Sequence, residues 1–337
     1  MKRLVQAFAA TAFAASALAA GFALAGGAAV AQPAAGEPGW PSRPIRLIVP
    51  FPPASTADVV ARVLGQKLGL RLGQQFVVEN RVGASGNIGA ELIAKAAPDG
   101  YTVGIVTSST QAVAVTLSPS LPYDPIRDFT PILTIASSPY VLVVYPGLPA
   151  KSVAELIDLA KRKPGALNYG SAGPASLAHL AGALFATMTN TQLIHVPYKS
   201  TAQSVIDMMS GRLEMQFATI PPSIQTIRAG QLRALAVTGK QRVDALPDVP
   251  TMAEAGVPGY DATLWFGLVA PAKFSPNLAG RLNREIAEIL AAADMKDLLS
   301  QQGLVAEAGP PEALTERVRS DIGKWREVIA KAGITAE

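Results

Sequence analysis

The part of the sequence best suited to bind a ligand is a short loop between an expected strand and an expected helix. Residues 45–49 form an apolar run typical of a buried parallel strand, and the prolines at 50, 52 and 53 end it. Ser55 or Thr56 can cap a helix that begins at about residue 56, with Asp58 placed to complete a capping box. The first turn of such a helix has unpaired N–H groups that favour an anion. The same pattern also fits an ordinary βα unit of a doubly wound sheet.

A second loop repeats this order of elements. An expected strand from about residue 167 leads through Ser171 and Gly173 to Ser176, and a helix over about 177–188 follows. The free N–H groups at the start of this helix offer a second place for an anion. The sequence therefore predicts two anion-binding loops of the same kind, each followed by a helix start. We call these two loops, residues 50–56 and 171–176, the cradles.

Side chains at the ends of two further strands could add to these cradles. Four hydroxyl residues at 107–110, Thr-Ser-Ser-Thr, follow a strand over 102–106, although each of them could instead cap a helix. Lys199 follows a strand over 193–196 and is a candidate charge partner for an anion, and Thr201 can cap a helix over 202–210. Most lysines on loops are only solvated, so both interpretations of Lys199 stay open.

Patterns for catalysis, metals and nucleotides are missing from the sequence. His179 and His195 have no cysteine or carboxylate neighbours at ligand spacing, and no HExxH, GxSxG or phosphate-loop pattern occurs. The glycines at 83, 86 and 89 follow a second strand over 76–79 and have the wrong spacing for a dinucleotide site. His179 lies three residues after Ser176, but a catalytic dyad also needs an orienting group and an oxyanion site. We expect a binding protein without a metal or cofactor rather than an enzyme.

Composition favours a packed globular chain. With 337 residues, of which 49% are hydrophobic and 16% charged, the chain exceeds one usual core, so two domains are expected. The net charge of +4 falls to +2 without the first 31 residues, because Lys2 and Arg3 are lost and 27 basic residues face 25 acidic ones. With no basic stripe and no aromatic platform, nucleic acid is not an expected partner. The absence of cysteine excludes disulfides and thiolate chemistry.

The first 31 residues have the pattern of an export signal. Lys2 and Arg3 precede a long uncharged segment, and Ala29-Val30-Ala31 is a small-x-small cleavage site. A retained membrane anchor is the alternative, but the segment is dominated by weakly hydrophobic alanine and glycine. Residues 32–42 show no periodicity and are expected to be a flexible leader.

The remaining elements predict an α/β fold that crosses twice between two lobes. Separate strands are expected over 132–136 and 140–145, and a strand over 265–270 should return to the first lobe. Lobe 1 is thus predicted as residues 43–140 plus 265–337, and lobe 2 as residues 141–264. Helices are expected over 276–292 and 294–302. A final helix with Leu314, Val318, Ile322, Trp325 and Ile329 on one face is expected to cover lobe 1.

Several short motifs in a fixed order resemble one protein family. They are Pro44 to Arg62, Val78 to Arg81, Ala97 to Tyr101, Leu121 to Pro125, Tyr169 to Gly173, His195 to Lys199, Leu246 to Thr251, and the late Trp325. Over residues 40–335 the chain resembles the substrate-binding proteins of tripartite tricarboxylate transporters, the Bug or TctC receptors. Each motif is weak alone, but their order and spacing are specific.

The resemblance implies a two-lobed, flytrap-like periplasmic binding protein of type II, with each lobe a mixed sheet flanked by helices. It implies a monomer that binds a small organic carboxylate between the lobes and delivers it to membrane permease subunits. The ligand contacts it implies are Phe51, Pro52, Ala54, Ser55, Thr56, Ala57, Thr107, Ser108 and Ser109 in lobe 1, and Ser171, Ala172, Gly173, Ser176, Lys199, Ser200 and Thr201 in lobe 2.

Three departures from the family pattern predict a reshaped site. Ala54-Ser55, Ala175 and Ser200 stand where the family usually has glycine, so each adds a Cβ where backbone would approach a ligand. We expect a carboxylate other than citrate or an amino acid, with a flat aromatic acid as one candidate, or a ligand that has no carboxylate at all. A receptor that signals to a two-component sensor kinase and an enzyme on the same fold are the alternative functions.

Overall fold

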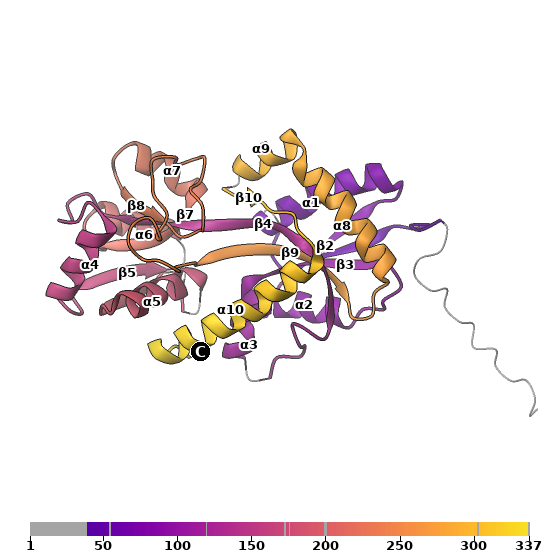
Figure 1. Ribbon diagram of the computed structural model, residues 1–337, viewed down its shortest axis with the longest axis horizontal. Helices are drawn as coiled ribbons and strands as arrows, with labels where there is room; N and C mark the ends of the chain where they lie inside the picture. Colours follow the sequence, from indigo (N-terminus) through magenta and orange to yellow (C-terminus); the bar gives the residue numbers. More distant parts are fainter. Residues whose placement is uncertain are drawn as a thin grey trace, which may run out of the picture. The chain divides into compact units, whose positions relative to one another are not determined.

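The computed structural model describes residues 39–53, 55–118, 120–171, 173–174, 176–198, 201–301 and 303–335 (Figure 1). The expected export signal and most of the expected leader lie outside these residues. The last residues of that leader are folded, however. Trp40 is buried, its indole N–H donates to the Gly100 carbonyl at 3.1 Å, and its own carbonyl accepts from Arg281 at 2.7 Å. The folded chain therefore begins before residue 43, because a large aromatic side chain anchors it to lobe 1.

The strands of lobe 1 form a mixed sheet in the order β2-β1-β3-β9-β4. These strands are β1 (Ile45–Val49), β2 (Phe76–Asn80), β3 (Thr102–Thr107), β9 (Thr263–Pro271) and the first part of β4 (Phe129–Val144), with the short β10 (Val305–Ala306) paired to β4. β1 is parallel to β2 and β3, whereas β9 is antiparallel to β3 and β4. The helices that accompany this sheet are α1 (Thr56–Leu72), α2 (Asn87–Ala94), α8 (Pro276–Ala291) and α9 (Ala293–Gln301). Within the described residues, no helix has both the length and the apolar character needed to cross a bilayer.

Lobe 2 repeats the same βαβαβ order. Its strands are β5 (Leu167–Ser171), β6 (Leu193–Pro197), β7 (Met215–Thr219), β8 (Arg233–Val237) and the end of β4. Its helices are α4 (Val153–Arg162), α5 (Leu177–Thr189), α6 (Thr201–Met209) and α7 (Ile220–Arg228). β5 is parallel to β6 and β7, and β4 is antiparallel to β7 and β8. The unit β5-α5-β6-α6-β7 corresponds to β1-α1-β2-α2-β3 of lobe 1, so each lobe places a helix start after a buried strand.

The strand β4 differs from the sequence prediction because it is one strand of 16 residues rather than two. Residues 129–139 pair with β9, and residues 140–144 pair with β7 and β8. Register shifts after Pro131 and Thr134 let the ladder continue past a proline that cannot donate. β4 changes partners between Pro139 and Tyr140, next to the predicted lobe boundary, and it runs through both sheets (Figure 1).

The C-terminal helix α10 (Pro311–Ala332) packs on both lobes, although it was expected to cover lobe 1 alone. Leu314 and Val318 pack in a cluster with Trp265 of β9, whereas Trp325 and Ile329 belong to the core of lobe 2. The buried Asp321 lies between these two groups and accepts a hydrogen bond from the Trp265 indole at 2.7 Å. The apolar face of α10 was enough to predict that this face is buried. The sequence pattern could not show that the two ends of the face pack in two different cores.

Gly89 in α2 permits the close approach of α2 to the loop after β1. A Cβ at this position would lie 2.7 Å from Pro50 Cα and 2.9 Å from the Arg81 carbonyl oxygen, which are backbone atoms. We therefore expect Gly89→Ala to lower the free energy of unfolding by about 1–3 kcal/mol in urea denaturation, because the backbone must move. The control is Gly323→Ala in α10, where nothing lies within 4 Å of the new Cβ and a neutral or stabilising effect is expected. Equal effects of the two substitutions would contradict this account.

Candidate functional site

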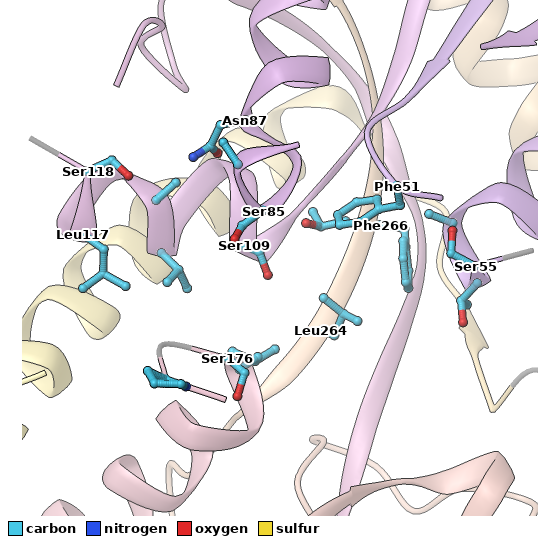
Figure 2. A pocket seen from close by; sticks show the side chains of 18 of the residues that line it. Phe51, Ser55, Ser85, Asn87, Ser109, Leu117, Ser118, Ser176, Leu264 and Phe266 are labelled. Atoms are coloured by element: carbon cyan, nitrogen blue, oxygen red, sulfur yellow. The ribbon is translucent and has the colours of Figure 1, made fainter. Parts of the chain in front are cut away.

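A cleft of about 700 Å³ is lined by residues of both lobes (Figure 2). Its polar side chains are hydroxyls and one amide, namely those of Ser55, Thr56, Ser85, Asn87, Thr107, Ser109, Ser118, Tyr140, Thr335 and Ser176. Its apolar lining includes Phe51, Val113, Leu117, Leu264, Phe266 and Leu177. Among the described lining residues none carries a charge. A ligand here would meet hydroxyl groups, helix starts and aromatic rings.

The lobe 1 cradle is fixed by a helix cap and by an asparagine. Ser55, one of the two predicted caps, is the N-cap of α1, and its hydroxyl accepts from the Asp58 N–H at 3.3 Å. The Asn80 side chain donates to the Phe51 carbonyl at 2.9 Å and to the Asp58 carboxylate at 2.8 Å. Phe51, Ser55, Thr56 and Ala57 line the cleft, whereas Pro52 does not, and Ala54 lies outside the described residues. The loop is therefore held at both ends beside the first turn of α1.

A turn that the sequence analysis set aside also lines the cleft. Ala84 and Ser85, in the short helix η1 (Ala84–Gly86), have positive φ angles of 46° and 55°. A Cβ at Gly86 would lie 2.9 Å from Thr110 Cγ2 and 3.4 Å from the Phe51 ring. Because Gly86 has no Cβ, this turn can lie close to Thr110 and the Phe51 ring. The sequence analysis considered the glycines at 83, 86 and 89 only as a nucleotide motif. These glycines, together with Asn87, were the sequence feature that could have indicated a turn in the cleft lining.

The hydroxyl residues after β3 have different roles. Thr107 and Ser109 line the cleft, whereas Ser108 is buried and does not. The Thr110 hydroxyl accepts from the Thr107 N–H at 3.1 Å and also contacts the Thr107 carbonyl at 3.2 Å, which fixes the turn. The chain continues through η2 (Ser109–Val113), which has π-helical geometry, into α3 (Ala114–Leu117). π-helical segments occur often at functional sites.

The lobe 2 cradle contributes Ser176 to the cleft. The Ser176 hydroxyl caps α5 by accepting from the His179 N–H at 3.3 Å, and it donates to the Gly173 carbonyl at 2.8 Å. Ser171 and Gly173 do not line the cleft, because the buried Ser171 hydroxyl contacts the Gly173 carbonyl at 2.9 Å and His195 Nε2 at 2.6 Å. Ser171 thus stabilises the loop before α5 through these contacts and does not face the cleft. The shared crevice is formed by Ser55 and Ser176, and not by Ser55 and Ser171.

The other expected contacts of lobe 2 cannot be placed in the cleft. Ala172, Lys199 and Ser200 lie outside the described residues, as does Ala175. Thr201 begins α6. The proposed reshaping of the site by Ala54, Ala175 and Ser200 therefore stays a prediction.

Two stacked histidines contact the lobe 2 cradle, His195 through Ser171 and His179 through Ser176. The rings of His179 and His195 are 3.6 Å apart at their centroids and 6° from parallel. Burial and the neighbouring His195 lower the pKa of His179 to about 4, and burial lowers the pKa of His195. Both rings are therefore neutral near pH 7, which allows them to stack without repulsion.

Acidification should destabilise the protein through this pair. An unfolded histidine has a pKa of about 6.5, so between about pH 6.5 and 4 the unfolded chain binds protons that the folded chain does not. The stabilising contribution is fully present above pH 6.5 and is lost as the pH falls. His179→Phe keeps an aromatic ring but removes one titrating group, so we expect Tm to fall less between pH 7 and 4 in this variant than in the parent. Identical pH profiles in differential scanning fluorimetry would contradict the assignment.

Comparisons with known proteins show which family this chain matches. Residues 60–334 match the family model described as the tripartite tricarboxylate transporter family receptor. The chain is 39% identical over 298 residues to a protein of Pseudomonas sp. strain P51 named for the tcbD-tcbE intergenic region, and the match covers 88% of both chains.

Solved structures with the same fold include two with bound acids. Rpa4515 of R. palustris, solved with adipate, is 38% identical with a TM-score of 0.73, and the match covers 88% of this chain and 100% of the other. MatC of Rhodopseudomonas palustris, solved with bound malate, is 29% identical with a TM-score of 0.69, covering 86% of this chain and 100% of the other. The fold is thus that of the two-lobed periplasmic binding proteins, and the chain belongs to the tripartite tricarboxylate transporter receptor family of solute-binding proteins, the Bug or TctC receptors.

Proposed function

We propose that this protein is a periplasmic receptor that binds a small organic carboxylate in the cleft and delivers it to the permease of a tripartite tricarboxylate-type transporter. The observation that carries the proposal is that the starts of α1 and α5, one from each lobe, line a single cleft. Helix starts bind anions through free N–H groups and the helix dipole. The described lining has no charged group that would compete for them.

The ligands of two relatives support a carboxylate. Rpa4515 was solved with adipate and MatC with malate, and both compounds carry carboxylate groups. Both proteins match nearly the whole folded part of this chain. We infer the same chemical class of ligand here, with its identity left to measurement.

Closure of the lobes is the mechanism that fits a cleft lined from two sides. A ligand that contacts both helix starts binds the closed form better than the open form, and this difference in affinity is what shifts the equilibrium. The closed form then presents a surface to the permease that the open form lacks.

Export to the periplasm is part of the proposal. The charged start, the uncharged segment and the small-x-small site within residues 1–31 support cleavage after Ala31. We propose that the mature receptor acts as a monomer. In proteoliposomes that contain the cognate permease, uptake of labelled ligand should require the receptor, and uptake without it would contradict the proposal of delivery.

A negative charge added at the start of α1 should weaken ligand binding without lowering the thermal stability of the protein. A carboxylate in the first turn of a helix is favourable for the helix itself, so Thr56→Asp should leave Tm without ligand unchanged or higher. The same charge would repel an anionic ligand, and we expect binding to weaken by roughly 10- to 100-fold, from about 1–3 kcal/mol of repulsion. Isothermal titration with adipate and malate measures this change.

The control is Thr56→Asn, which has nearly the same shape as the aspartate but no charge, and should bind within about threefold of the parent. If adipate, malate and a wider panel of carboxylates all fail to bind or to raise the Tm of the parent protein, the proposed function is wrong.

A further inference from the structure

A small cavity between η2 and α10 shares no lining residue with the cleft. Its volume is about 20 Å³, and it is lined by residues of β3, η2, the loop before β4, β4, β9 and α10. We propose that this cavity is a binding site for one internal water molecule, held by the Gln111 side-chain amide of η2 and the Thr315 hydroxyl of α10. The site goes beyond the proposed function, because it does not depend on any ligand of the cleft.

Gln111 provides the first observation. Its side chain is 1% exposed and lines the cavity, and its Nε2 group has no hydrogen-bond partner among the described residues. A buried donor that is left unpaired costs free energy, so native structures nearly always give such a group a partner from protein or from ordered water. The cavity is the space that Gln111 lines, and it is therefore where a water partner for the amide would lie.

The segment around Gln111 contains several groups of the same kind. Six buried side-chain nitrogen or oxygen atoms lack a partner within the described part of the chain, and four of them belong to Thr107, Ser108, Gln111 and Thr116. Of these four residues, only Gln111 lines the small cavity. Their concentration within residues 107–116 indicates that solvent, rather than protein groups, supplies hydrogen bonds to this segment.

The size of the cavity selects water over a larger ligand. A cavity needs at least about 10–15 Å³ to hold one water molecule, and about 20 Å³ is present here. Sites for organic ligands have volumes of roughly 300–1,000 Å³. The space therefore fits one water molecule and excludes an organic acid.

Thr315 provides the second polar group of the site. Among the described residues that line the cavity, Gln111 and Thr315 have polar side chains and the others are apolar. A buried water makes about three hydrogen bonds, with a range of about two to four. The Gln111 amide can donate to the water oxygen and the Thr315 hydroxyl can accept from the water, so these two side chains supply two of them.

The proposed water would join two parts of the molecule that matter for the cleft. η2 forms part of the cleft wall, because Ser109 and Val113 line the cleft. The small cavity is also lined by Leu314 and Val318 of α10, whose later residues belong to the core of lobe 2. A bridging water is nearly as favourable in enthalpy as a direct hydrogen bond. It would therefore give the cleft wall a polar link to the helix that packs on both lobes.

A high-resolution crystal structure of the parent protein tests the site directly. We expect one ordered water at about 2.7–3.2 Å from both Gln111 Nε2 and the Thr315 hydroxyl. In Gln111→Met, which keeps an unbranched side chain of similar length but cannot donate, the same density should be absent. A dry cavity in the parent, or a Gln111 amide that donates to a protein carbonyl instead, would overturn the proposal.

Thermal unfolding gives a second test in which the water need not be seen. Thr315→Val removes the hydroxyl with little change in shape, so it should lower the Tm of the parent by roughly 1–3 °C. In the Gln111→Met background the same substitution should lower Tm by less than half as much, because no bound water remains to lose a partner. Equal shifts in the two backgrounds would overturn the water bridge.

The matched control for this test is Thr116→Val. The Thr116 hydroxyl is buried without a partner in the described chain, and Thr116 does not line the cavity. Its removal loses no hydrogen bond, so Tm should stay unchanged or rise. A fall in Tm as large as that of Thr315→Val would mean that loss of any threonine hydroxyl in this region destabilises the protein, and the assignment of Thr315 to the water would be wrong.

Discussion

The proposed binding of an anion depends on backbone N–H groups that a helix cannot satisfy within itself. At the start of α1 and of α5, Ser55 and Ser176 each accept from one such group and leave the others in the first turn available. These groups carry only partial charge, so they bind an anion well only where they are fixed in place. Most other contacts around the cleft serve this purpose. Asn80 holds the loop before α1, and Ser171 holds the loop before α5.

Two helix starts can face one ligand only if the lobes that carry them are connected in a defined way. β4 supplies this connection, because it pairs with β9 in lobe 1 and with β7 and β8 in lobe 2. α10 adds a second connection, with Leu314 packed in lobe 1 and Trp325 in the core of lobe 2. The hydrogen bond from Trp265 to Asp321 joins β9 to this helix where it passes between the two. Any closing motion must therefore bend elements that belong to both cores.

The elements that the sequence predicted well are those determined by near neighbours in the chain. The cap at Ser55 depends on residues within one turn of the helix, and it is present. The continuous β4 could not be predicted, because Pro131 and Pro139 argue locally for breaks and only pairing with β9 shows how the ladder passes them. The burial of Trp40 depends on Gly100 and Arg281, which are far away in the sequence. The place of Ser85 in the cleft lining was missed for a related reason, since its turn ends at Gly86, where a Cβ would approach Phe51 and Thr110, two residues more than 20 positions away in the sequence.

An uncharged lining also fits the task of a receptor that must release its ligand. A buried arginine or lysine left without its anion would carry a large desolvation cost, which would hold the ligand and slow its release. When water replaces the anion, the loss of favourable free energy is smaller for hydroxyl groups, an amide and helix starts, because each is neutral or carries only partial charge. The attraction then comes from many weak groups on two walls, and it falls steeply once the walls separate. Among the described residues the cleft lining is uncharged, so the affinity proposed for it would depend on geometry that opening of the lobes would remove.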